Sequence, residues 1–228
     1  VTASIYDACH YFRLFQNMAK SRPFHRAVSR HRNLQSPLRQ WLFQSNMTAS
    51  LPHTHKPKPL FTCPNYQNPS GITYTAANRA AMTTLLKQHN VMLVEDDPYG
   101  ELGFTSMTAP SFRALMPDQC IALGSFSKIA APGMRLGWLI APKSVMERVV
   151  IAKQATDFHS SNFAQRVLHQ YLTTNPIDTH IALIQHAYAT QCAAMVRAIE
   201  KYFPSDVRFT RPQGGMFIWV TLPEGMDS

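Results

Sequence analysis

Short apolar runs that end in polar clusters are the feature that most constrains how this chain can fold. Three such runs, at 60–63, 91–94 and 120–124, are followed within a few residues by Asn68, Asp96 and Lys128 respectively. Apolar runs without polar alternation are typical of parallel strands covered on both faces. We therefore predict an α/β domain in which ligands bind outside the carboxyl ends of the strands. A further strand is predicted at 136–140.

Helical patterns separate and follow these strands. Thr75 is predicted to cap a helix that runs to about Gln88. Its expected apolar side consists of Ala77, Ala80, Ala81, Leu85 and Leu86. Later helices are predicted at 142–156, at 161–172 and, capped by Asp178, at 178–202. Two short strands, at 207–210 and 216–222, are predicted after them.

The formal net charge of +9 comes from one part of the chain. No acidic residue lies between Asp7 and Glu95, and 11 Lys or Arg against one acid precede Glu95. From Glu95 onward the count is 11 against 12. A nucleic-acid-binding arm would use these basic residues, but it explains none of the strand-end clusters. We rank the arm below the interpretations that do explain them. For the basic stretch itself, we favour a solvated or poorly folded segment without binding function.

Other classes of protein are excluded by simple patterns. No apolar run approaches the roughly 18 residues of a membrane span, so no membrane association is predicted. The first residues lack a secretory-signal pattern, and the four cysteines are scattered without metal-ligand or disulfide spacing. We expect reduced thiols, no metal site and a cytoplasmic location. Because the chain begins at Val1 rather than Met, we expect it to be an excerpt of a longer product.

The strand-end residues suggest specific chemistry. Lys128 follows an apolar strand, where partial desolvation favours the neutral amine that Schiff-base formation needs. Ser125, Ser127 and Arg135 offer two hydroxyls and one forked cation, a set that suits a phosphate dianion. Asp96 adds a carboxylate. Each cluster alone has a common alternative, since single lysines are usually solvated and Asp-Pro-Tyr is a frequent turn.

Together the clusters resemble a known family. The motifs are Asn68-Pro69-Ser70-Gly71, Asp96-Asp97-Pro98-Tyr99, Ser125-Phe126-Ser127-Lys128, Arg135-Leu136-Gly137-Trp138 and the stretch 212–219. In order and spacing they resemble fold-type I, pyridoxal-phosphate-dependent aminotransferases of class I/II, in particular the 2-aminoadipate and aromatic aminotransferases. The effector domains of MocR-type GntR regulators are similar too. The resemblance covers about residues 60–228. It implies part of a large domain, with a mostly parallel sheet and helices on both faces, and the start of a small α+β domain.

The resemblance implies a catalytic set of Lys128, Asp96 and Tyr99. Lys128 matches the lysine that holds the cofactor covalently and moves a proton between the substrate Cα and the cofactor's C4′. Asp96 matches the aspartate that faces the pyridine nitrogen and keeps the ring protonated. Tyr99 matches a donor to the cofactor's phenolic oxygen. Asp97 and Glu95 receive no role.

The remaining cofactor-binding residues are implied in the same way. Asn68 matches the second donor to the phenolic oxygen. Ser125, Ser127 and Arg135 match the phosphate anchor. The expected cofactor is therefore pyridoxal 5'-phosphate, and the expected activity is transfer of an amino group between an amino acid and a 2-oxo acid by a homodimer. The alternative is a regulator effector domain, with nucleic acid as a partner only if an unseen N-terminal DNA-binding domain exists.

Residues 1–59 depart from the family pattern. We find there neither the glycine-containing phosphate loop nor the ring-stacking aromatic residue, and the arginine for the substrate carboxylate does not appear after 215–217. A degenerate or out-of-frame segment over 17–59 is our hypothesis for this. The domain prediction is 1–59 without family pattern, 60–177 as the cofactor-binding large domain and 178–228 as an incomplete small domain. We expect the isolated polypeptide to bind cofactor weakly and to transaminate poorly.

Overall fold

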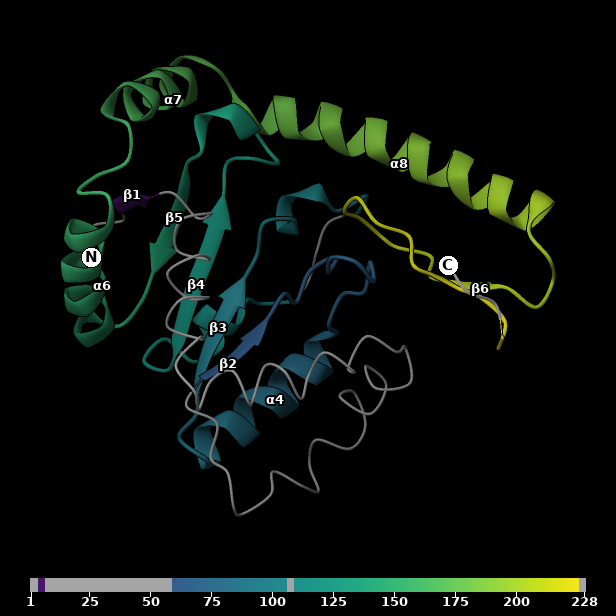
Figure 1. The fold of residues 1–228 in the computed structure, drawn as a ribbon, viewed down its shortest axis with the longest axis horizontal. Helices are drawn as coiled ribbons and strands as arrows, with labels where there is room; N and C mark the ends of the chain where they lie inside the picture. The colour runs from purple at the N-terminus through teal and green to yellow at the C-terminus, as the bar shows by residue number, and fades with distance from the viewer. Residues whose placement is uncertain (1–3, 7–58, 106–108, 226–228) are drawn as a thin grey trace.

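A five-stranded sheet carries the fold, with helices packed against it (Figure 1). The computed structural model describes residues 4–6, 59–105 and 109–225. Its first half contains β1 (Ser4–Tyr6), β2 (Pro59–Thr62), α4 (Ala76–Gln88), β3 (Met92–Asp96), η1 (Gly100–Leu102) and α5 (Phe112–Leu115). The second half contains β4 (Cys120–Ser125), η2 (Pro132–Met134), β5 (Gly137–Ile140), α6 (Lys143–Thr156), α7 (Asn162–Thr174), α8 (Ile177–Tyr202), β6 (Arg208–Phe209) and β7 (Val220–Thr221).

The sheet has the order β1-β5-β4-β3-β2 and is mixed. The three predicted apolar runs form β2, β3 and β4, which are parallel, with Phe61 opposite Val94 and Val94 opposite Ile121. β5 is antiparallel to β4, and β1 is antiparallel to β5. The predicted α/β class is confirmed. Because β5 runs in the opposite direction, it begins at the edge where the parallel strands end.

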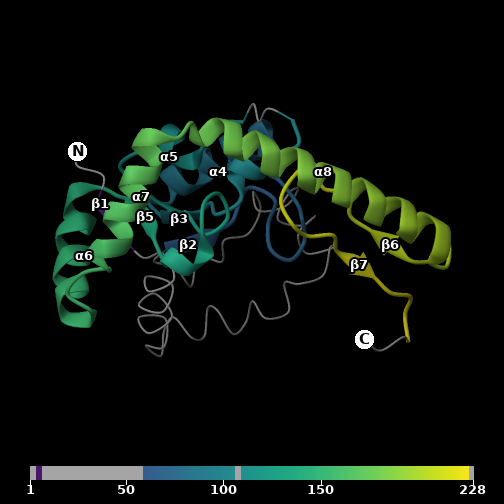
Figure 2. The same ribbon diagram turned by 90° about the horizontal axis from the view of Figure 1, so that it is seen from above.

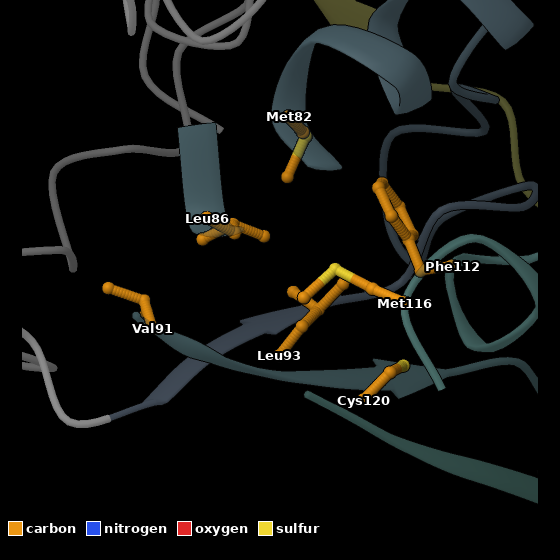
Figure 3. Close-up of a cluster of buried hydrophobic side chains, with 7 residues drawn as sticks. All are labelled: Met82, Leu86, Val91, Leu93, Phe112, Met116 and Cys120. Carbon is orange, nitrogen blue, oxygen red and sulfur yellow. The ribbon is translucent and has the colours of Figure 1, made fainter. Parts of the chain in front are cut away.

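Helices cover both faces of the sheet, as predicted. On one face, α4 and α5 pack against β3 and β4 through Met82, Leu86, Val91, Leu93, Phe112, Met116 and Cys120 (Figure 3). On the other face, Ile121 and Leu123 of β4 pack with Leu139 and with three apolar residues of α6. Successive strand residues point to opposite faces, so β4 contributes to both clusters. Each buried Leu or Phe here contributes about 1.5–3 kcal/mol.

The predicted apolar side of α4 is wrong for its three alanines, whereas Leu86 is buried as predicted. Ala77, Ala80 and Ala81 are exposed, and the buried residues of the helix are Arg79, Met82, Thr83 and Leu86. These four follow a spacing of three and four residues, so they share one side of the helix. The prediction missed this side because a charged residue and a hydroxyl residue belong to it. The Thr75 cap is confirmed, since the Asn78 amide donates to its hydroxyl at 3.2 Å.

The C-terminal half is helical, as predicted. Ser161 caps α7 by accepting from the Ala164 amide. The long helix α8 begins at Ile177, and Asp178 lies in its first turn instead of capping it. A carboxylate there still favours the helix N-terminus. From the sheet, α8 extends toward the β6–β7 hairpin (Figures 1 and 2), whose strands are shorter than predicted.

The predictions on membrane spans, cysteines, residues 1–59 and domain boundaries are tested only in part or not at all. None of the described helices is long and apolar enough to cross a membrane. Cys63, Cys120 and Cys192 are free thiols. Residues 7–58 lie outside the described part, and so do the predictions that concern them, although β1 at 4–6 pairs with β5. The domain boundaries at 59/60 and 177/178 stay predictions.

Candidate active site

Adjacent strands bring the predicted site residues to one edge of the sheet. Asp96 ends β3 and lies opposite Leu123, two residues before Ser125 at the end of β4. Ser125 in turn lies opposite Gly137, two residues after Arg135. The antiparallel direction of β5 is what brings Arg135 to this edge. This edge therefore carries a carboxylate at the end of β3, a hydroxyl at the end of β4 and a guanidinium just before β5.

Asp96 is half-buried, and its environment opposes its negative charge. Burial first, and then the neighbouring Asp97 carboxylate, raise the pKa of Asp96 to about 6. A cation placed beside Asp96 would favour its ionised form. This carboxylate is therefore suited to face a protonated ring nitrogen.

Asn68 and Tyr99 meet although they follow different strands. Tyr99 is 6% exposed, and burial raises the pKa of its hydroxyl. A hydrogen bond from the Asn68 side chain opposes that increase in pKa. The Tyr99 ring packs edge-on against Phe217, with 5.5 Å between ring centroids. Two neutral donors are thus placed side by side near Asp96, whose charge also acts on Tyr99.

The connection between β4 and β5 carries the anion-binding candidates. The Ser127 amide donates to Ser125 Oγ at 3.1 Å, which leaves the Ser125 hydroxyl proton for an acceptor elsewhere. Arg135 follows η2 with a positive φ of 54° and is exposed. One guanidinium nitrogen donates to the Pro132 carbonyl at 3.2 Å, and the guanidinium has further donors for an anion.

Lys128 lies in the turn directly after β4 and is half-buried. The Ala130 amide donates to the Phe126 carbonyl at 2.9 Å and closes this turn. Ile129, the next residue, packs against the cluster of Tyr66, Tyr99 and Leu102. The lysine-bearing turn therefore lies against the part of the molecule that contains Tyr99.

Sequence reasoning assigned no site role to Cys63 or Phe217. Cys63 directly follows β2, and burial and then the charges of Asp96 and Asp97 raise the pKa of its thiol to about 12. Phe217 comes from the stretch after Gly215, whose amide donates to the Leu102 carbonyl at 2.9 Å. The 212–219 motif was the available signal for Phe217. The described residues contain no group of three or more His, Cys, Asp or Glu arranged for a metal ion.

Comparison with known proteins agrees with this arrangement. The family described as aminotransferase class I and II matches residues 43–227. Aromatic-amino-acid aminotransferase 1 of Thermococcus litoralis is 38% identical over 174 residues, which are 76% of this chain and 42% of that protein. An HTH-type transcriptional regulator of Bacillus subtilis, YisV, is 30% identical over 73% of this chain and 35% of its own length.

A solved structure extends the comparison to three dimensions. LysN, the alpha-aminoadipate aminotransferase of Thermus thermophilus, was solved with N-(5'-phosphopyridoxyl)-L-leucine. It aligns with a TM-score of 0.73 and 32% identity over 75% of this chain and 45% of that chain. The chain thus spans less than half the length of the relatives it matches. With the family match extending over most of its residues, the chain belongs to the class I and II aminotransferases.

Proposed function

We propose that this chain binds pyridoxal 5'-phosphate and that the protein transfers an amino group between an amino acid and a 2-oxo acid. The observation that carries the proposal is the strand register, which places Asp96 beside β4 and Ser125 beside the start of β5. A carboxylate, a lysine and an anion-binding set at one edge match the ring nitrogen, the aldehyde and the phosphate of this cofactor.

Each residue has a distinct task in this proposal. Lys128 would hold the cofactor covalently, and its free amine would move a proton at the substrate Cα. Asp96 keeps a proton on the ring nitrogen. Bound pyridoxal phosphate supplies an electron sink for the electron pair left at Cα.

The other site residues orient the cofactor. Asn68 and Tyr99 donate hydrogen bonds toward its phenolic oxygen, which is consistent with the contact between their side chains. Ser125, Ser127 and Arg135 hold the phosphate with two hydroxyls and one fork-shaped cation. A phosphate dianion would also neutralise the exposed Arg135 side chain.

We further propose a homodimer in the cytoplasm. Ile151 of α6, Phe158 in the following turn and Phe163 of α7 are 62%, 78% and 78% exposed. Such apolar side chains on neighbouring segments are typical of a protein-binding surface, and a second copy of the chain is the partner that we propose. The free thiols of the described cysteines support a reducing compartment.

The experiment is a titration of the chain with pyridoxal 5'-phosphate, followed by visible absorption. A titration is used because we expect this polypeptide to bind the cofactor weakly. Saturable formation of a lysine-bound absorption band is expected in the wild type and in Lys143→Ala, whose lysine is exposed at the start of α6. The band should be lost in Lys128→Ala. Aromatic amino acids and 2-aminoadipate then test amino-group transfer to a 2-oxo acid, and an unchanged band in Lys128→Ala would refute the site.

A regulator effector domain is the second candidate. The similarity to YisV favours it, and nucleic acid would then be a partner only through a DNA-binding domain elsewhere in the protein. The two candidates differ in turnover. A lysine-bound band that persists unchanged with every amino acid in the panel would favour the regulator.

A further inference from the structure

A buried arginine lies behind the site and connects the two loops that carry Asn68 and Tyr99. Arg79 of α4 is 0% exposed. Its guanidinium donates to the carbonyls of Tyr74 and Pro110, both at 3.2 Å, and to the Asn65 side-chain oxygen. With these bonds and the ring of Phe112 at 5.8 Å, the arginine is held rigidly. Its guanidinium therefore has a fixed position, and the residues that accept hydrogen bonds from it are held in place.

Asn65 is the first residue that Arg79 holds in place. It is 2% exposed and lies three residues before Asn68, at the start of the loop after β2. Its oxygen accepts from Arg79, and its nitrogen donates to Asp97 Oδ2 at 2.8 Å. Because the arginine is only a donor, it determines which way the Asn65 amide faces. The amide nitrogen must then point to Asp97.

Asp97 is the second residue, held through Asn65, and it belongs to the loop after β3. Its backbone amide donates to the Leu123 carbonyl at 2.9 Å, which continues the pairing of β3 with β4. Its carboxylate fills the turn that contains Tyr99 and Gly100. A Cβ atom at Gly100 would collide with Asp97 Oδ2, so a larger residue there would require the carboxylate to move. The conformation of the Tyr99 turn therefore depends on where this carboxylate lies.

Asp96 lies on the face of the sheet opposite to Arg79, Asn65 and Asp97. Glu95 and Asp97 alternate with Asp96 along the strand direction, so they point toward α4 while Asp96 points away. Glu95 lies 4.0 Å from Arg79 and accepts the Phe112 amide at 3.0 Å. Both neighbours of Asp96 are thus tied to the same arginine, one directly and one through Asn65.

We propose that Arg79, Asn65 and Asp97 are positioning residues that set the distance between the Asn68 loop and the Tyr99 loop. The inference rests on the proposed function, because the consequence is the geometry of the two donors to the cofactor's phenolic oxygen. The Asn65–Asp97 hydrogen bond is the bridge between the loops. Its geometry, rather than the charge of Asp97, does the positioning.

The decisive variant is Asn65→Asp, which has nearly the same shape. It keeps an oxygen for Arg79 but replaces the donor to Asp97 with a second acceptor. The double variant Asn65→Asp/Asp97→Asn exchanges the donor and the acceptor and restores a hydrogen bond. Thr83→Val is the matched control, since Thr83 is buried one turn further along α4 but lies outside the link. Should Asn65→Asp fail to fold, Asp97→Ala breaks the same bond from the other side.

Three readouts follow, one of which needs no cofactor. In the cofactor-free chain, amide hydrogen exchange at 66–68, 70–71 and 99–100 should be faster in Asn65→Asp and return toward wild type in the double variant. In titrations with pyridoxal 5'-phosphate, Asn65→Asp should weaken binding about 10-fold, the low end of what loss of a supporting hydrogen bond causes at metal centres. The pH midpoint of the bound cofactor's visible absorption should rise, because the phenolic oxygen loses aligned donors. Thr83→Val should change none of these.

The outcomes separate this proposal from the proposed function. Normal exchange and normal binding in Asn65→Asp would overturn the positioning role while leaving the site itself intact. Failure of the double variant to recover the exchange rate and the affinity would also overturn it, because the hydrogen bond between the loops would then not explain the loss. If the wild type forms no lysine-bound band, the proposed function fails. The exchange measurement then still decides the link between the loops.

Discussion

At the end of β3, the acidic side chains on the two faces of the sheet lie in opposite environments. Toward α4, Glu95 is 2% exposed, accepts the amides of Phe112 and Arg113 at 3.0 Å each, and lies 4.0 Å from Arg79. On the other face, none of the described basic residues forms an ion pair with Asp96. A buried acid with partners makes the fold depend on those partners, whereas an acid without a cation is suited to bind one. The difference separates the supporting face from the reactive face.

The largest expected effect is on the α4 face. Arg79→Met should lower the free energy of unfolding by about 3–5 kcal/mol, because it leaves a buried carboxylate without its cation. Denaturant unfolding at neutral pH measures the change. Lys87→Met removes an exposed lysine from the same helix and should stay within about 0.5 kcal/mol of wild type. Equal effects of the two variants would mean that this face is not the supporting one.

On the Asp96 face, a substitution is expected to raise the free energy of unfolding instead of lowering it. The pKa of Asp96 is raised from 3.8 to about 6, so between these values the folded chain binds more protons than the unfolded chain. Stability from this group therefore falls as the pH rises from about 4 to 6. Asp96→Asn removes that loss and should stabilise the cofactor-free chain at pH 7 by on the order of 1–3 kcal/mol.

Unfolding of Asp96→Asn and wild type across this pH window tests the sign. The two free energies should be similar below pH 4, diverge between about pH 4 and 6, and differ by a constant amount above pH 6. The same variant should bind cofactor more weakly, since the ring nitrogen loses its carboxylate. An Asp96→Asn chain that is less stable than wild type at pH 7 would place Asp96 among the supporting groups.

The smallest effect concerns a polar atom within the supporting face. No described residue offers a hydrogen-bond partner to the buried Oγ1 atom of Thr83. Thr83→Val keeps the branched shape and removes the desolvated hydroxyl, so a gain of about 1 kcal/mol in unfolding free energy is expected. Thermal unfolding measures it, with Thr84→Val as the control because Thr84 is exposed. A loss of stability in Thr83→Val would indicate a partner for that hydroxyl.

Much of the fold could be predicted from the sequence because its signals are local. The apolar runs at 60–63, 91–94 and 120–124 correspond to the three parallel strands, and their polar ends lie at one edge. The direction of β5 could not be predicted, because a four-residue apolar strand is compatible with either direction. That direction decides where Arg135 lies.

The supporting network was harder to predict because its signals are not local. Arg79 reads as a solvated residue of an alanine-rich helix, and Asn65 reads as an ordinary turn residue. Asn65 bonds to Asp97, which is 32 residues away in the sequence, and its oxygen accepts from Arg79. A charged residue on the buried side of a helix also contradicts the apolar pattern by which that side is recognised. Pairing of distant polar residues leaves no periodic trace in a single sequence.

The most direct test of the reactive face is to find where the cofactor attaches. Borohydride reduction of the chain with pyridoxal 5'-phosphate fixes the lysine-bound form, and peptide mass spectrometry then identifies the labelled lysine. The account predicts label on Lys128, in the turn after β4, and loss of saturable labelling in Lys128→Ala. Label spread over exposed lysines such as Lys143 and Lys201, with none on Lys128, would contradict it.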